Sequence, residues 1–133
     1  MKRTYQVIQI MFICITIIVA LTTYHLLPQE IATHWNIHGQ VDGWGNKALL
    51  YRLMPALSIA ILLLMKGLPY IDPKKEKYAL FANTYEGMQT IFTVFFTYMF
   101  CVFIYCNIYG APSITFFMLI GIGLLFVLLG NVM

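Results

Sequence analysis

Four long apolar segments constrain this chain more strongly than any other feature of its sequence. They span roughly residues 5–27, 48–66, 76–109 and 113–131. About 20 apolar residues make a helix long enough to cross the ~30 Å hydrocarbon core of a bilayer. The sequence therefore predicts an all-α polytopic membrane protein. Its four transmembrane helices form an antiparallel bundle, a single membrane domain over residues 1–133.

The composition agrees with a lipid environment. The chain is 61% hydrophobic and only 10% charged, whereas soluble domains average about 45–50% apolar and about 25% charged residues. No stripe of basic and aromatic residues favours direct binding of nucleic acid. The three cysteines lie inside apolar runs without C-x-x-C spacing, which gives no reason to expect a metal site there.

The first segment allows two interpretations, a signal peptide or an uncleaved span. Lys2 and Arg3 provide the basic start of a signal peptide. The apolar stretch that follows is longer than the usual ~7–15 residues of such a peptide, and no small-residue cleavage motif ends it. We therefore expect a transmembrane helix that stays in the protein.

The basic residues predict the orientation. Lys47 and Arg52 lie on one side of the membrane, and six basic residues lie on the other: Lys2, Arg3, Lys66, Lys74, Lys75 and Lys77. The side richer in Lys and Arg is normally cytoplasmic. Both termini are then cytoplasmic, residues 28–47 form an outer loop and residues 67–75 an inner loop. Asp72 and Ser113 are the predicted N-caps of the third and fourth helices.

The outer loop is the most distinctive part of the chain. It is about twenty residues long, whereas most loops have about four to six. Trp35 and Trp44 suit a membrane interface, where an indole ring sits half buried. Glycines at three positions permit turns. We expect an ordered loop that lies on the outer surface.

Individual loop residues have a structural and a functional interpretation. Asp42-Gly43 is typical of a turn in which the Asp side chain bonds the backbone. His34 and Asn36 are expected to hydrogen-bond loop carbonyls. Alternatively, Asp42 and Lys47 bind a partner at the outer face, since a rigid loop suits recognition.

The loop pattern LPQEIATHWNIHGQVDGWGNK, followed by a helix and then IDPKKEKY, resembles the SdpI-like family, the Sdp-type immunity proteins of Gram-positive bacteria. That family opens with a four-helix membrane domain of otherwise unknown function. The resemblance implies a multi-pass protein of the bacterial plasma membrane that protects against a secreted peptide toxin. In some members it also implies signalling, by sequestering a DNA-binding repressor at the membrane.

The resemblance also implies two sets of site residues. Eight outer-loop positions are expected to bind: His34, Trp35, Asn36, Gly39, Asp42, Gly43, Trp44 and Lys47. Four inner positions are expected to face a cytoplasmic partner: Asp72, Lys74, Lys75 and Lys77. Gly130-Asn131 is similar to the start of the family's second half, so two further spans are expected beyond Met133.

Other classes of function remain as alternatives. A small transporter or channel subunit would use polar groups inside the bundle: Thr16, Ser58, Glu86, Thr90, Thr93 and Thr97. His34 and His38 have metal-ligand spacing if their segment is helical, which is the basis for a metalloenzyme. No Ser/His/Asp or Cys/His arrangement supports catalysis, so we expect no enzymatic activity, no metal and no cofactor.

Overall fold

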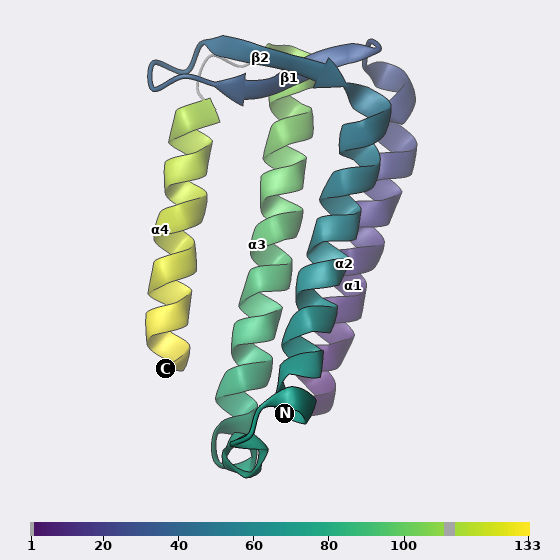
Figure 1. Ribbon diagram of the computed structural model, residues 1–133. Coiled ribbons are helices and arrows are strands. Elements are labelled where there is room, and N and C mark those ends of the chain that lie inside the picture. The colour runs from purple at the N-terminus through teal and green to yellow at the C-terminus, as the bar shows by residue number, and fades with distance from the viewer. Residues whose placement is uncertain (1, 111–113) are drawn as a thin grey trace.

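The computed structural model describes residues 2–110 and 114–133 of the protein, and Figure 1 shows its helices. The elements are α1 (Lys2–Thr23), the short 3₁₀ helix η1 (Tyr24–Leu26), β1 (Glu30–Trp35), β2 (Val41–Asn46), α2 (Lys47–Ile71), the 3₁₀ helix η2 (Lys75–Phe81), α3 (Ala82–Tyr109) and α4 (Ile114–Val132). Within these described residues, four helical segments are long and apolar enough to cross a membrane. The predicted fold class, an all-α polytopic membrane protein, is confirmed.

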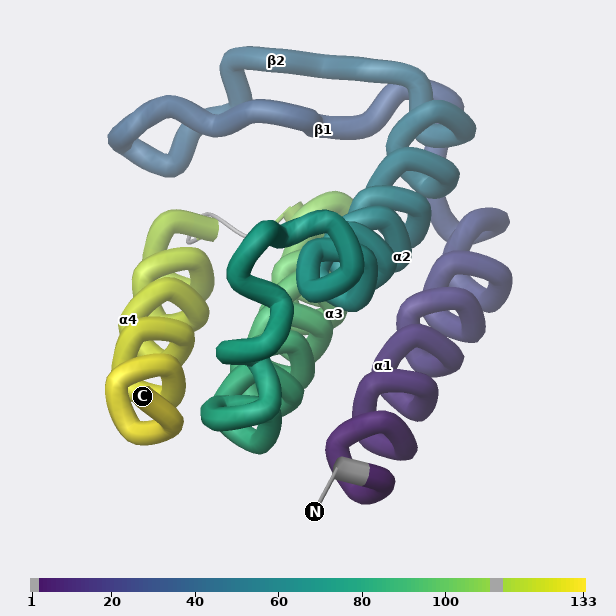
Figure 2. Tube along the Cα trace, turned by 60° about the horizontal axis from the view of Figure 1, so that its bottom comes forward, coloured from purple at the N-terminus to yellow at the C-terminus, as the bar shows by residue number. Residues whose placement is uncertain are grey.

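Helix α3 is the centre of the assembly. Helices α1 and α2 pack on one side of α3, and α4 packs on the other (Figures 1 and 2). The strands β1 and β2 form an antiparallel hairpin that lies across the ends of the helices. The start of α1 and the end of α4 lie at the opposite end of the molecule. We call the two ends the hairpin end and the termini end.

Helix α2 is longer than the sequence predicted, ending at Ile71 rather than at residue 66. Pro69 lies inside it, and a proline cannot donate to the carbonyl four residues earlier. That carbonyl belongs to Met65, and the Tyr85 hydroxyl of α3 donates to it instead at 2.6 Å. A side chain on the neighbouring helix thus supplies the missing donor, so the helix continues through the proline.

Helix α3 begins at Ala82, after the 3₁₀ helix η2, rather than at residue 76 as expected. Asp72, the predicted N-cap of this helix, is instead the C-cap residue of α2. Its carboxylate accepts from the Lys74 backbone N–H at 2.7 Å and from the Tyr78 hydroxyl at 3.1 Å. The residue organises the turn between the helices, which is why α3 starts later. Ser113, the other predicted cap, lies outside the described residues.

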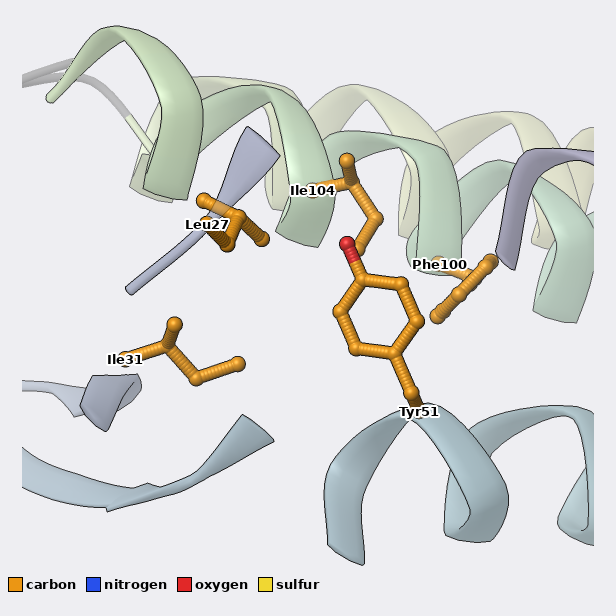
Figure 3. Packing of buried hydrophobic residues seen from close by; sticks show 5 residues of the cluster. All are labelled: Leu27, Ile31, Tyr51, Phe100 and Ile104. Carbon is orange, nitrogen blue, oxygen red and sulfur yellow. The ribbon is translucent and has the colours of Figure 1, made fainter. Parts of the chain in front are cut away.

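The interior changes character along its length. Near the hairpin end it is an apolar cluster drawn from four elements or their ends: Leu27, Ile31, Tyr51, Phe100 and Ile104 (Figure 3). The rings of Tyr51 and Phe100 meet edge to face, with centroids 5.8 Å apart. Toward the termini end, the α1–α3 contact is lined by polar side chains. The α1–α3 contact is thus polar in the termini half of the molecule, whereas the cluster in the hairpin half is apolar.

The α3–α4 contact depends on a glycine. Tyr98 of α3 lies across α4 and donates to the Phe117 carbonyl at 2.8 Å. A Cβ on Gly121 would stand 2.5 Å from a ring carbon of Tyr98. The absent side chain therefore lets the tyrosine ring lie against the α4 backbone.

Replacement of this glycine tests the packing. Gly121→Ala should displace the Tyr98 ring and lower the stability by about 1–3 kcal/mol, as overpacking does. Gly123→Ala is the matched control, because nothing lies within 4 Å of its Cβ position. It should leave stability unchanged or raise it by up to about 1 kcal/mol through helix propensity. Thermal unfolding in detergent distinguishes the two, and equal melting temperatures would contradict this packing.

Candidate functional site

The outer loop is a β-hairpin, which the sequence analysis did not predict. Strands β1 and β2 pair between Glu30↔Asn46 and Trp35↔Val41, with register shifts on either side of His34. A Cβ on Gly43 would stand 2.9 Å from the Cβ of His34. Gly43 therefore permits the close approach of the two strands. The turn expected at Asp42-Gly43 is wrong, because both residues lie inside β2.

The actual turn is organised by Asn36. Its side-chain oxygen accepts from the backbone N–H groups of His38 at 2.9 Å and Gln40 at 3.0 Å. Its backbone N–H donates to the Gln40 carbonyl, and its own carbonyl accepts from Gly39. Gly39 has a φ of 75°, a conformation that favours glycine. Asn36 and Gly39 therefore shape the hairpin. The expected bonds to loop carbonyls are wrong, because the Asn36 side chain accepts from backbone N–H groups and His34 pairs with Asp42.

The hairpin is attached to α3 by one amide side chain. Asn107 accepts from the Ala32 backbone N–H at 2.8 Å and donates to the Ala32 carbonyl at 3.1 Å. The carboxamide thus pairs with β1 much as another strand would. Trp35 adds an edge-to-face contact with Phe103, at 6.0 Å between centroids. Sequence analysis missed Asn107, although an amide among apolar residues near the end of a span was the available signal.

Lys47 attaches the start of α2 to η1, the short helix that follows α1. It is only 7% exposed. Its ammonium donates to the carbonyls of Leu27 at 2.5 Å and Tyr24 at 3.0 Å, and lies 4.6 Å from the centre of the Tyr24 ring. A cation at the end of a helix satisfies carbonyls that have no partner in the helix. The structure therefore gives Lys47 a structural contact and not an exposed position.

The exposed chemistry of the hairpin lies elsewhere. His34 Nδ1 and Asp42 Oδ1 are 2.5 Å apart, and their side chains are 71% and 44% exposed. Trp44 is also exposed, at 66%. His34 lies in a strand and His38 in the turn beyond it, so the two are not one helical turn apart as the metal hypothesis required.

A pocket lies beneath the hairpin. Its volume is about 330 Å³, and it is bounded by β1 above and by α2, α3 and α4 below. His34 and Trp35 line its roof. Its other walls are largely apolar and include three methionines from three helices: Met54, Met99 and Met118. Methionine side chains adapt readily to irregular apolar partners. We call this the outer pocket.

The termini half contains a polar seam between α1 and α3. It comprises Gln9, Thr16, Glu86, Gln89, Thr90, Thr93 and Thr97, all buried. Gln9 donates to the Thr90 hydroxyl at 3.0 Å and approaches a Glu86 carboxylate oxygen at 3.5 Å. The hydroxyls of Thr16 and Thr97 are 2.8 Å apart. The structure thus brings together most of the residues named for the transporter alternative. Gln9 was missed, since it stands near the start of its apolar segment.

The inner motif is partly structural as well. Asp72 is engaged with Lys74 and Tyr78, as described for the fold. The side chains of Lys74, Lys75 and Lys77 are exposed on the turn around η2. These three lysines are available to solvent or to lipid headgroups at the termini end.

Comparison with known proteins identifies a described domain in part of the chain. The profile of a family described as "Domain of unknown function (DUF1648)" matches residues 11–59. This domain is found in SdpI-like membrane proteins. The matched segment runs from α1 through the whole hairpin into α2. No curated protein and no solved structure matches the chain.

The attachment of the hairpin can be tested at Asn107. Asn107→Ala should leave the Ala32 backbone groups unpaired, at a cost of about 1–3 kcal/mol. Hydrogen exchange of the β1 amides should then accelerate about tenfold or more. Asn83→Ala is a matched control, because Asn83 is exposed near the other end of the same helix. Unchanged exchange in Asn107→Ala would contradict this attachment.

Proposed function

We propose that this chain is a non-enzymatic immunity protein of the bacterial plasma membrane, similar to SdpI. It intercepts a secreted peptide toxin at the hairpin end, before the toxin permeabilises the bilayer. One observation carries the proposal. The segment that matches a domain of SdpI-like proteins contains the whole hairpin, which carries exposed polar and aromatic side chains at one end of the helices.

The geometry of the hairpin end supports capture of an amphipathic peptide. The paired His34 and Asp42 offer hydrogen-bonding groups on the exposed side. Trp44 offers an exposed aromatic ring of the kind enriched where proteins bind partners. The outer pocket, with its three methionines, accepts apolar side chains directly below.

The hairpin is held rigidly, which favours recognition. Asn107 fixes β1 to α3, and Lys47, directly after β2, fixes that end of the hairpin to η1. A preformed surface avoids the entropy cost of ordering a loop when the partner binds. In members that also signal, the exposed Lys74, Lys75 and Lys77 would contact a repressor at the cytoplasmic face.

A survival experiment tests the proposal. The chain is expressed in cells sensitive to the toxin of an Sdp-type producer strain, and the cells are exposed to that toxin. His34→Ala and Asp42→Ala should each lower the highest toxin concentration that the cells survive about tenfold. This is the effect of losing about 1.4 kcal/mol of binding free energy. Ile37→Ala is the matched control, because Ile37 is 88% exposed at the hairpin turn and offers no polar group.

Two results would contradict the proposal. Survival no better than that of vector controls, despite good membrane expression, would remove the immunity function. Full protection by His34→Ala and Asp42→Ala would remove the hairpin as the site of recognition.

A second candidate function, a small transporter or channel subunit, is favoured by the polar seam. Buried polar groups within a membrane bundle often mark a solute or proton path. The seam ends at the apolar cluster, where Phe100 and Ile104 follow Thr97 along α3. Flux of protons or solutes in proteoliposomes, lost in Glu86→Gln, would favour this candidate over immunity.

A further inference from the structure

A second cavity opens at the termini end, far from the hairpin. It has a volume of about 350 Å³ and is bounded by α1, α2, η2 and α3. This volume lies near the lower end of the range of ligand pockets, about 300–1,000 Å³. We call it the inner cavity. Its walls include charges of both signs and several tyrosine rings: Lys66, Glu86, Gln89, Tyr70, Tyr78 and Tyr85.

The two charged groups of the inner cavity are incompletely paired. Lys66 Nζ lies 3.6 Å from a Glu86 carboxylate oxygen, longer than the ~2.7–2.9 Å of a strong charge-assisted hydrogen bond. The ammonium donates to Gln89 at 3.2 Å. A lysine has three donors, so Lys66 keeps donors for a ligand. Within residues 2–110 and 114–133, the second carboxylate oxygen of Glu86 makes no hydrogen bond, so it can accept one.

The tyrosines add a surface suited to a cation. The rings of Tyr78 and Tyr85 are 5.1 Å apart and nearly perpendicular. Their hydroxyls are engaged with Asp72 and with the Met65 carbonyl, which fixes the rings in place. Aromatic faces attract ammonium groups, particularly beside a carboxylate. The cavity thus offers a cation-binding wall at Glu86 and an anion-binding group at Lys66.

The position of the inner cavity across the membrane indicates which molecules can reach it. Lys66 precedes the last residue of α2, Ile71, by five positions, or about 7.5 Å along the helix. That distance places the ammonium at the headgroup region and not at the bilayer centre. The most abundant molecules at this depth are phospholipids, whose headgroups carry a phosphate and, in some classes, a primary ammonium.

We propose that the inner cavity binds the headgroup of phosphatidylethanolamine from the adjacent leaflet. The lipid phosphate accepts from Lys66, and the lipid ammonium donates to Glu86 beside the rings of Tyr78 and Tyr85. A purely anionic headgroup suits the site less well, since it brings no cation to Glu86. A choline headgroup also suits it less well, because its three methyl groups leave no N–H to donate to the carboxylate.

Lipid-dependent thermal stability tests the proposal. Protein purified in detergent is heated with added phosphatidylethanolamine, phosphatidylcholine or phosphatidylglycerol of the same acyl chains. A ligand that binds only the folded state raises the melting temperature. Phosphatidylethanolamine should raise it by about 4 °C or more beyond the other two lipids. Equal shifts with all three lipids would overturn the proposal.

Variants separate the site from a general lipid effect. Lys66→Gln and Glu86→Gln should each abolish the selective shift, whereas Lys66→Arg should keep it. Arg52→Gln and Glu76→Gln are matched controls, because both residues are exposed and lie outside the inner cavity. Retention of the selective shift by both Lys66→Gln and Glu86→Gln would overturn the proposal.

A soluble ligand distinguishes the source of the headgroup. Glycerophosphoethanolamine carries the same phosphodiester and ammonium but no acyl chains. It should not change the melting temperature at the concentration at which phosphatidylethanolamine raises it. A shift as large as that of the lipid would assign the cavity to a free small molecule and overturn the lipid proposal.

Discussion

The absence of water from the hydrocarbon core is the constraint on which the rest of the structure depends. Each polar group buried there must find a partner within the chain. Backbone groups that are buried at the two ends of the bundle find partners in the same way: the Tyr85 hydroxyl donates to the Met65 carbonyl, Asn107 pairs with Ala32 of β1, and Lys47 donates to the carbonyls at the end of η1. Each one satisfies a backbone group that its own helix or strand leaves open. The same contacts join the helices and hold the hairpin against them.

This constraint also explains how the two halves of the molecule differ. At the hairpin end, hydrogen bonds from Asn107 and Lys47 to backbone groups hold the hairpin over apolar helix ends. The His34–Asp42 pair stays exposed on the hairpin. In the termini half, satisfaction comes from side chains that bond to one another, such as Gln9 with Thr90. The hairpin end therefore carries the exposed His34–Asp42 pair, and the termini half carries the buried polar seam with Glu86. The proposed toxin and lipid sites follow this division.

The sequence predicted the four spans, because apolar length reveals them, but not where α2 ends and α3 begins, which contacts between the two helices decide. The hairpin was not predicted, since Gly43 and Gly45 in β2 are typical of turns and only the close approach of His34 and Thr33 explains them. Lys47 was expected on an exposed surface, because local sequence does not show that η1 ends beside it. The inner cavity joins Lys66 to Glu86 across two helices. A pair of this kind depends on how α2 and α3 pack against each other, and the sequence of one helix alone does not specify that packing.

The central claim is that the hairpin faces the outside while η2 and both chain ends face the cytoplasm. Labelling of single cysteines in intact cells with a membrane-impermeant maleimide measures this directly, in a background where the native cysteines are replaced by serine. Trp44→Cys should be labelled in intact cells, and Lys75→Cys only after the membrane is permeabilised. Labelling of Lys75→Cys in intact cells, with Trp44→Cys protected, would contradict the claim.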